Sequence, residues 1–217
     1  LNVLKDISGI ENILSLSHST NVQRFFYSSS SEVYGEPVEF PQKEDTTPLN
    51  SRLPYAIVKN VGEAYVKSYY QEYDLEYTIF RFFNTYGPLQ SVDFVITKFL
   101  SQALSGEDIT VFGDGSQTRT FCYVDDNLDT VEKMLEQDLA FNSVLNIGNN
   151  IEITMLELAQ KIIEITNSSS GIVHLPALKE GDMTRRLPDI SKMIKILGRE
   201  LTSLDDGIKI MIDALKN

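Results

Sequence analysis

The chain has 217 residues, with 31 acidic and 19 basic side chains and a formal net charge of −12. This negative charge argues against a nucleic-acid partner, because contacts to phosphates require clustered Lys and Arg. The apolar runs are too short to span a bilayer, and no basic-then-apolar leader opens the chain, so no membrane partner is expected. A single cysteine, Cys122, excludes an internal disulfide and fits a cytoplasmic protein.

Helices and strands alternate along the first half of the chain. Apolar residues at helical spacing predict a helix over 3–17, and the apolar run 22–27 is typical of a buried strand. After a loop rich in proline and acidic residues, a helix is expected over 55–73 and a second buried strand over 76–83. The sequence Asn-Thr-Tyr-Gly-Pro at 84–88 ends that strand. This alternation predicts a doubly wound α/β fold with a parallel sheet.

Shorter elements are expected after residue 88. They are a helix over 94–104 that ends at Gly106, a strand over 109–112, a helix over 126–139, a strand over 144–147, a helix opened by a capping box at Thr154 and Glu157, a strand over 172–175, a helix that ends near Gly198 and a last helix from about 203.

Tyr55 and Lys59 lie four residues apart and therefore share one face of the predicted helix. Free tyrosine titrates near pH ~10, and a neighbouring cation favours its phenolate, which can then take a proton from a hydroxyl group. The pattern is common by chance and on its own also fits an ordinary exposed pair. Ser30 and Asn84 follow two predicted strands, where ligands bind in doubly wound sheets. Together these positions indicate a catalytic site.

Six segments carry a resemblance to one family, in that family's order along the chain. The segments are SSSSEVYG (28–35), PYAIVK (54–59), RFFNTYGP (81–88), VFGDGSQTRTFCYVDD (111–126), NIGN (146–149) and GDMTRRLPDISK (181–192). The chain resembles the extended short-chain dehydrogenase/reductases that act on nucleotide sugars. These include UDP-galactose 4-epimerases, dTDP-glucose 4,6-dehydratases and UDP-glucuronate decarboxylases. The resemblance implies an enzyme that uses NAD, acts on a nucleotide-diphospho-sugar such as a UDP-sugar, and forms a homodimer.

The resemblance also implies a role for each matching residue. Tyr55 is the expected base, Lys59 binds the nicotinamide ribose and tunes Tyr55, and Ser30 hydrogen-bonds the C4 hydroxyl of the sugar. Arg119 grips the diphosphate, where a guanidinium suits paired phosphate oxygens. The expected catalytic residues are Ser30, Glu32, Tyr55, Lys59 and Arg186. The expected cofactor-binding residues are Ser28, Tyr55, Lys59 and Phe82. The expected substrate-binding residues are Asn84, Thr110, Phe112, Arg119 and Asp182, with no metal.

A domain organisation follows from the same resemblance. The expected fold is a doubly wound, Rossmann-like parallel sheet that lacks its N-terminal βα units, with a smaller α/β substrate-binding domain. Residues 1–87 and 119–149 are expected to form the C-terminal part of the NAD-binding domain, and residues 88–118 and 150–217 the nucleotide-sugar-binding domain. None of the 12 glycines forms the G-x-G-x-x-G pattern that approaches a pyrophosphate. We therefore expect a longer protein, and an inactive fragment if this is the whole chain.

The residues after Ser30 bear on the choice of reaction. The 4,6-dehydratases carry Asp-Glu there, and the acid protonates the leaving hydroxyl, whereas this chain has Ser31-Glu32. The segment instead resembles the UDP-glucuronate decarboxylases, in which oxidation at C4 gives a β-keto acid that loses carbon dioxide. Their usual Gly-Pro-Arg is Gly-Pro-Leu89 here, which favours a UDP-sugar 4-epimerase. We therefore expect decarboxylation first and 4-epimerisation as the alternative. Dehydration, or NAD-free binding of a nucleotide sugar without catalysis, ranks below both.

Overall fold

The computed structural model describes residues 3–177 and 185–216, which group into two compact units. The first unit comprises Leu1–Phe83, Asp129–Gly148 and Pro188–Arg199, and the second comprises Asn84–Leu128, Asn149–Leu187 and Glu200–Asn217. Within the described ranges, no helix is both long enough and apolar enough to cross a membrane.

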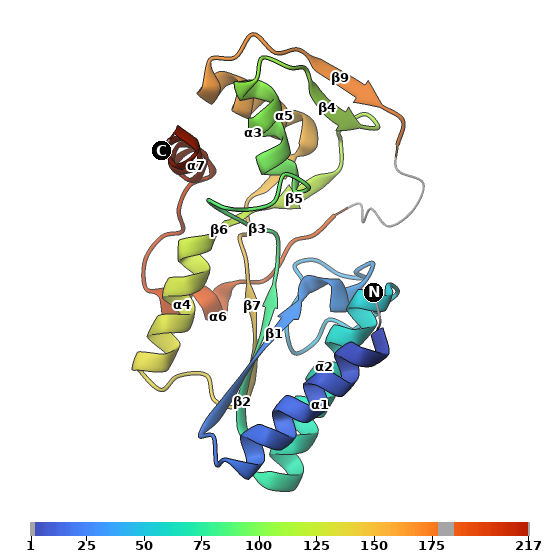
Figure 1. Ribbon diagram of the computed structural model, residues 1–217, viewed down its shortest axis with the longest axis vertical. Helices are drawn as coiled ribbons and strands as arrows, with labels where there is room; N and C mark the ends of the chain where they lie inside the picture. Colours follow the sequence, from blue (N-terminus) through green and yellow to red (C-terminus); the bar gives the residue numbers. More distant parts are fainter. Residues whose placement is uncertain (1–2, 178–184, 217) are drawn as a thin grey trace. The chain divides into compact units, whose positions relative to one another are not determined.

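A three-stranded parallel sheet with the order β1-β2-β7 forms the centre of the first unit (Figure 1). The strands span Arg24–Ser30, Glu76–Phe82 and Ser143–Ile147. β2 has a parallel neighbour on each side and is buried at five of its seven positions, which include the apolar Tyr77, Ile79 and Phe80. These parallel strands, connected through helices, confirm the expected α/β fold class.

Helices flank this sheet on both sides (Figure 1). On one side α1 (Val3–Ser19) packs against α2 (Pro54–Tyr73), and α2 packs against β1 and β2. On the other side α6 (Ser191–Leu197) packs against β7. Lys133, in the part of α4 that belongs to this unit, donates a hydrogen bond to the backbone of α6. Both faces of the sheet are therefore covered, as a parallel sheet requires.

The close approach of α2 to β1 depends on Gly62. A Cβ atom at this position would lie 2.0 Å from the hydroxyl oxygen of Tyr27, which belongs to β1. Any other residue type would therefore require the Tyr27 ring or the helix to shift. Lys59 and Glu63 lie in the same turn of α2 as Gly62, so this contact holds both of them against the carboxyl end of β1.

The second unit joins short strand pairs to a helical core. β4 pairs with β9 and β3 with β6 in parallel, and β5 pairs with β8 in antiparallel orientation. Side chains of α3, β4, α5 and α7, among them Leu100, Ile109, Leu158 and Ile208, form one buried cluster. The elements are β3 (Thr85–Tyr86), α3 (Val95–Leu104), β4 (Ile109–Phe112), β5 (Thr118–Thr120), β6 (Cys122–Tyr123), β8 (Glu152–Thr154), α5 (Met155–Thr166), β9 (Ile172–Leu175) and α7 (Leu204–Lys216), with α4 (Val124–Glu136) spanning both units.

Most of the predicted elements are confirmed to within two residues. The capping box is present, since Thr154 Oγ1 accepts from the Glu157 amide at 3.1 Å and Glu157 Oε2 accepts from the Thr154 amide at 2.8 Å. Three predictions were displaced. β1 runs to Ser30 because its register pairs the serines with the end of β2, and α4 spans Val124–Glu136, so it starts two residues and ends three residues earlier than predicted. The cap of α3 is Ser105, and Gly106 follows it with a φ of 71°.

Candidate functional site

Tyr55 and Lys59 lie in the first two turns of α2, as predicted. Lys59 Nζ donates to the Ser28 carbonyl oxygen at 2.6 Å and lies 5.7 Å from the centre of the Tyr55 ring. Tyr55 is 46% exposed, so its phenol is accessible to a ligand. Burial lowers the pKa of Lys59, and the negative charge of Asp6 opposes this effect. The structure therefore brings three predicted residues together at the carboxyl end of β1.

A second tyrosine lies equally near the Lys59 ammonium. The ring centre of Tyr27 is 5.5 Å from Lys59 Nζ. Tyr27 is only 8% exposed, and burial together with the charge of Glu63 raises its pKa. The Tyr27 phenol therefore keeps its proton, and the exposed Tyr55 is the side chain that can act as a base.

Ser30 ends β1 and caps a short 3₁₀ helix, η1 (Ser31–Tyr34). Its Oγ accepts a hydrogen bond from the Glu32 amide at 3.2 Å. A serine hydroxyl has one proton and two lone pairs, so this contact leaves the Ser30 O–H able to donate. Phe82 pairs with Ser30 in the sheet register, at the carboxyl end of β2. The predicted residues Ser30, Glu32 and Phe82 thus share the edge of the sheet with Ser28.

A buried ion pair lies directly behind this edge. Glu63, one turn after Lys59, accepts from Ser29 Oγ at 2.6 Å and from Arg81 Nε and Nη2 at 2.9 and 2.7 Å. The side chains of Arg81 and Glu63 are 2% and 1% exposed. Burial alone would lower the pKa of Arg81, but the hydrogen bonds and charge of Glu63 outweigh it and raise that pKa. The Arg81 guanidinium therefore remains charged inside the unit.

The buried network continues from Arg81 through Tyr34. Arg81 Nη1 donates to the Tyr34 hydroxyl at 2.9 Å, and that hydroxyl donates to Asn146 Oδ1 at 2.8 Å. Burial raises the pKa of Tyr34 to about 12, although Arg81 opposes the shift. The network connects β1, α2, β2, η1 and β7, and sequence reasoning missed it. The signal that could have revealed it is Arg81, a charged residue inside a strand expected to be buried.

Four of the predicted substrate-binding residues line one cavity of the second unit, with a volume of about 250 Å³. Thr110 and Phe112 lie two residues apart on β4, so their side chains share one face of the strand. Arg119 lies on β5, where its Nη1 donates to the Thr118 carbonyl oxygen at 2.7 Å. Asn84 donates through Nδ2 to a backbone oxygen at 3.1 Å. The predicted diphosphate and base contacts are thus brought together.

Sequence reasoning missed other residues of the same cavity. Lys98, on α3, lines it together with Asp93, and Lys98 Nζ lies 5.3 Å from the centre of the Phe112 ring. Gln117 also lines it and donates to the Phe112 carbonyl oxygen at 3.2 Å. With Arg119, the wall carries two cations and one carboxylate, although the chain has a net charge of −12. A cavity with this lining suits an anion that also has an aromatic part.

The remaining predicted residues lie outside these two groups. Arg186 belongs to the second unit and is 8% exposed, while its neighbour Arg185 is exposed and forms an ion pair with Glu152 at 2.6 Å. Leu89, which replaces the arginine of the decarboxylases, is fully exposed and has a φ of 67°. Asp182 falls outside the described residues.

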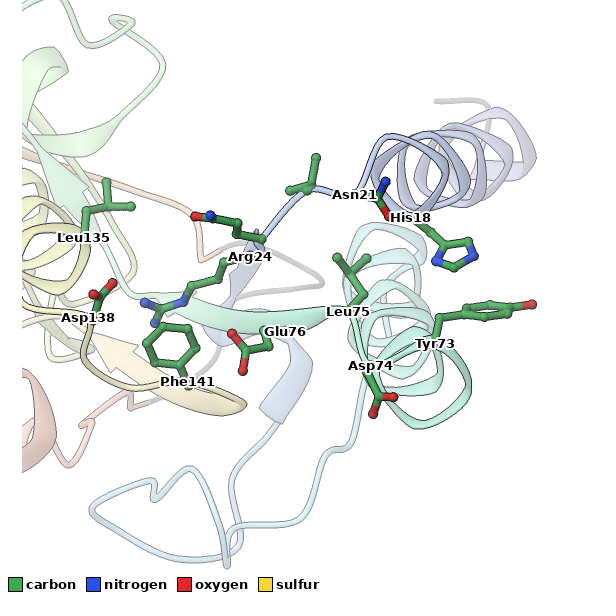
Figure 2. A pocket seen from close by; sticks show the side chains of 12 residues that line it. His18, Asn21, Arg24, Tyr73, Asp74, Leu75, Glu76, Leu135, Asp138 and Phe141 are labelled. Carbon is green, nitrogen blue, oxygen red and sulfur yellow. The ribbon is translucent and has the colours of Figure 1, made fainter.

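A larger cavity, of about 730 Å³, lies in the first unit where β1 and β2 begin (Figure 2). His18 and Tyr73 stack there with ring centres 4.3 Å apart. Arg24 lies 4.1 Å from the centre of the Phe141 ring and donates to Thr78 Oγ1 at 2.5 Å. None of the predicted site residues that the structure describes lines this cavity. Ligands of doubly wound sheets bind at the other ends of the strands, so the carboxyl edge remains the candidate site.

Comparisons with known proteins agree with this geometry. Residues 3–148 match the NAD dependent epimerase/dehydratase family. UDP-glucuronic acid decarboxylase 5 of Arabidopsis thaliana is 37% identical over 213 residues, which are 95% of this chain and 61% of that protein. The structure of a UDP-glucose 4-epimerase from Thermotoga maritima, solved with UDP-glucose, superposes with a TM-score of 0.91 and 32% identity, over 99% of this chain and 70% of that one.

A third comparison concerns a protein solved with both ligands. UDP-glucuronic acid 4-epimerase from Bacillus cereus, in complex with UDP-glucuronic acid and NAD, superposes with a TM-score of 0.88 and 28% identity, over 97% of this chain and 67% of that one. This chain spans less than two thirds of the length of the Arabidopsis relative.

Proposed function

Because this chain belongs to the NAD-dependent epimerase/dehydratase family, we propose that its full-length protein is an enzyme that oxidises a UDP-sugar transiently at C4. The proposed substrate is UDP-glucuronate, and the proposed outcome is its decarboxylation. The observation that carries the proposal is the exposed Tyr55 phenol beside the Lys59 ammonium, which the Ser28 carbonyl fixes at the carboxyl end of β1. Catalysis at this edge is what a doubly wound sheet favours.

The residues at this edge fit one part of an NAD site. The Lys59 ammonium has three protons and gives one to Ser28, which leaves two for the hydroxyls of a ribose. Ser28, Tyr55 and Phe82 are the other residues proposed to contact the cofactor. NAD, when bound, supplies the acceptor for the hydride that leaves C4. The chain's own residues supply the proton transfer and the geometry.

Tyr55 takes the proton of the C4 hydroxyl in the proposed reaction. The Lys59 ammonium lies beside this tyrosine, 5.7 Å from the centre of its ring, and Ser30 donates its remaining O–H to the same sugar oxygen. Oxidation places a ketone at C4, next to C5, which carries the carboxylate. The bond from C5 to the carboxylate carbon then breaks, its electrons move to the C4 oxygen, and carbon dioxide leaves. Glu32 and the buried Arg186 complete the proposed catalytic set.

Two observations favour decarboxylation over dehydration. Ser31 stands where the dehydratases have an acid, and it is 2% exposed, so this position supplies no proton to a leaving hydroxyl. The Arabidopsis relative is named as a UDP-glucuronic acid decarboxylase, and the alignment covers 95% of this chain. A UDP-sugar 4-epimerase is the second candidate. It is favoured by Leu89, which carries no charge for a sugar carboxylate, and by the likeness to the Thermotoga maritima epimerase.

Product analysis on the full-length protein distinguishes these reactions. UDP-glucuronate and NAD are incubated with the enzyme, and the products are separated and weighed by mass spectrometry. A product that has lost carbon dioxide supports the decarboxylase. A new isomer of unchanged mass contradicts the decarboxylase and supports the 4-epimerase. An enzyme that converts UDP-glucose and leaves UDP-glucuronate unchanged would also support the 4-epimerase. Binding of UDP without binding of NAD would indicate the non-catalytic alternative.

The proposal also covers the domains, the cellular compartment and the oligomeric state of the protein. We assign residues 1–87 and 119–149 to the NAD-binding domain and residues 88–118 and 150–217 to nucleotide-sugar binding, although the compact units group 84–87 and 119–128 with the second part and 188–199 with the first. A cytoplasmic homodimer that pairs through α1 and α2 is part of the same proposal. Exposed apolar side chains on the two helices, such as Ile13, Leu16 and Tyr70, support that pairing surface. Sedimentation of the purified protein tests the dimer.

Arg119→Ala is expected to raise the KM for UDP-glucuronate about tenfold or more, with a smaller change in kcat, because the diphosphate does not react. Arg185→Ala is the matched control, since Arg185 is exposed and bound to Glu152. Steady-state kinetics of both variants test the assignment. A KM that stays at the level of the control would remove Arg119 from the diphosphate site.

A further inference from the structure

We propose that Lys98 selects the nucleobase, by donating a hydrogen bond from its ammonium to an oxygen at C4 of the base. The cavity of the second unit then prefers a keto pyrimidine, such as uracil, over cytosine. The inference rests on the proposed function, in which a nucleoside diphosphate-sugar occupies this cavity. It adds a base-reading residue to the residues that hold the diphosphate.

The position of Lys98 follows from the way in which α3 packs. Ile96, Phe99 and Leu100 are buried by α3 in the core of the second unit, at 0 to 3% exposure. Lys98 lies between these residues in sequence and is half-buried at the wall of the 250 Å³ cavity. A lysine at such a wall keeps its methylene groups on apolar surface and presents its ammonium to the open side. Because α3 is held in the core, it places the Lys98 ammonium at the wall of the cavity.

The neighbour of the Lys98 ammonium is the aromatic ring expected to carry the base. Lys98 Nζ lies 5.3 Å from the centre of the Phe112 ring, and Phe112 is a half-buried residue of β4 that lines the cavity. Nucleobases stack on such rings whatever their identity, because every base has a π-face. Phe112 alone thus holds a base without distinguishing it. Because the ammonium lies over part of the ring face, a base that stacks on the rest of the ring has its edge beside the ammonium.

The ammonium distinguishes bases because it can only donate. Lysine has three N–H donors and no acceptor. Uracil and thymine present an oxygen at C4, which accepts such a bond, whereas cytosine presents an amino group that is itself a donor. A donor facing a donor leaves both unsatisfied inside the cavity, and that loss is larger when one of them is charged. Lys98 therefore favours the keto base and disfavours the amino base.

Arg119 provides a second cation with a different task. Its planar guanidinium suits paired oxygens of a diphosphate, while the compact ammonium of Lys98 is a point donor. The two residues lie on different elements, α3 and β5, on the wall of the same cavity. We infer that Lys98 governs the choice of base and Arg119 the affinity for phosphate. Loss of Lys98 should then leave the affinity for phosphate intact, and loss of Arg119 should leave the choice of base intact.

Isothermal titration of the 217-residue chain with UDP, CDP and uridine separates the two tasks. UDP should bind the unchanged chain about tenfold or more tightly than CDP, the size expected for a charged hydrogen bond gained or lost. In Lys98→Met this preference should fall to within about threefold, while the ratio of UDP to uridine affinity stays unchanged. In Arg119→Met the preference for UDP over CDP should stay unchanged, while the ratio of UDP to uridine affinity should fall. Lys209→Met, which removes an exposed charge of the same unit, is the matched control and should change neither ratio.

Other outcomes overturn the inference in distinguishable ways. If Lys98→Met lowers the UDP to uridine ratio and preserves the preference over CDP, Lys98 is a phosphate ligand and reads no base. If the variant resembles Lys209→Met, Lys98 contributes to neither discrimination. If the unchanged chain binds none of the three ligands, the proposed function fails and the inference with it. Circular dichroism of each variant shows whether the fold is preserved.

Discussion

Tyr55→Phe should lower the kcat of the full-length enzyme for UDP-glucuronate by roughly a thousandfold, within the range of about 10² to 10⁴ typical of general bases. The change removes the hydroxyl oxygen and keeps the ring. Tyr55 is 46% exposed and takes part in no buried network, so the melting temperature should stay within a few degrees of that of the parent. KM should change little, because the phenol contributes most to the transition state.

Tyr27→Phe is the matched control for Tyr55→Phe. Both rings lie at similar distances from Lys59 Nζ, 5.5 Å for Tyr27 and 5.7 Å for Tyr55. Burial raises the pKa of Tyr27, so its hydroxyl holds its proton and its loss should change kcat by less than about threefold. Rapid-quench or steady-state assays of the two variants, with thermal melts, measure both effects. A kcat that is lost in Tyr27→Phe and kept in Tyr55→Phe would reverse the assignment of the base.

The second large effect is expected from Glu63→Leu. This change leaves the guanidinium of Arg81 buried at 2% exposure without its carboxylate partner. Breaking a buried ion pair in this way costs about 3–5 kcal/mol, because the remaining charge keeps its desolvation penalty. The Ser29 hydroxyl loses its acceptor as well. We therefore expect a loss of that size in the free energy of unfolding, measured by urea denaturation of the chain.

The double variant Glu63→Leu/Arg81→Met separates the ion pair from the packing around it. Replacing both partners of a buried pair by apolar residues is often nearly neutral, so most of the lost stability should return. Lys161→Met, which breaks the half-exposed pair with Asp205 at 2.6 Å, should cost less than about 1 kcal/mol. A Glu63→Leu protein as stable as Lys161→Met would show that Arg81 is compensated by other groups. A double variant no better than the single one would place the loss in packing.

Local patterns in the sequence predicted the parts of the structure that depend on local chemistry. The apolar run at 76–83 and the capping box at 154–157 are confirmed because strand burial and helix caps follow from neighbouring residues. The four-residue spacing of Tyr55 and Lys59 predicted a shared helix face, and the two side chains are adjacent. These results required no knowledge of distant contacts.

Contacts between distant segments were not predictable in the same way. The β5–β8 pair joins 118–120 to 152–154, and each partner is three residues long, too short for a clear alternating pattern. The ion pair of Glu63 with Arg81 depends on how α2 lies on β2, which no local pattern encodes. Lys98 follows the helical spacing of α3 as an ordinary surface lysine would. Its place beside Phe112 becomes visible only once α3 and β4 pack together.

The contact between Gly62 and Tyr27 has a consequence for protein engineering. Glycine-to-alanine changes within helices are a common means of raising thermostability, with gains of up to about 1 kcal/mol. At position 62 the added methyl group would meet the Tyr27 hydroxyl at 2.0 Å and its ring carbon at 2.3 Å, so even phenylalanine at position 27 leaves no room. Stabilised designs should therefore treat positions 27 and 62 as a single coupled choice, in which a bulkier helix residue requires a smaller strand residue.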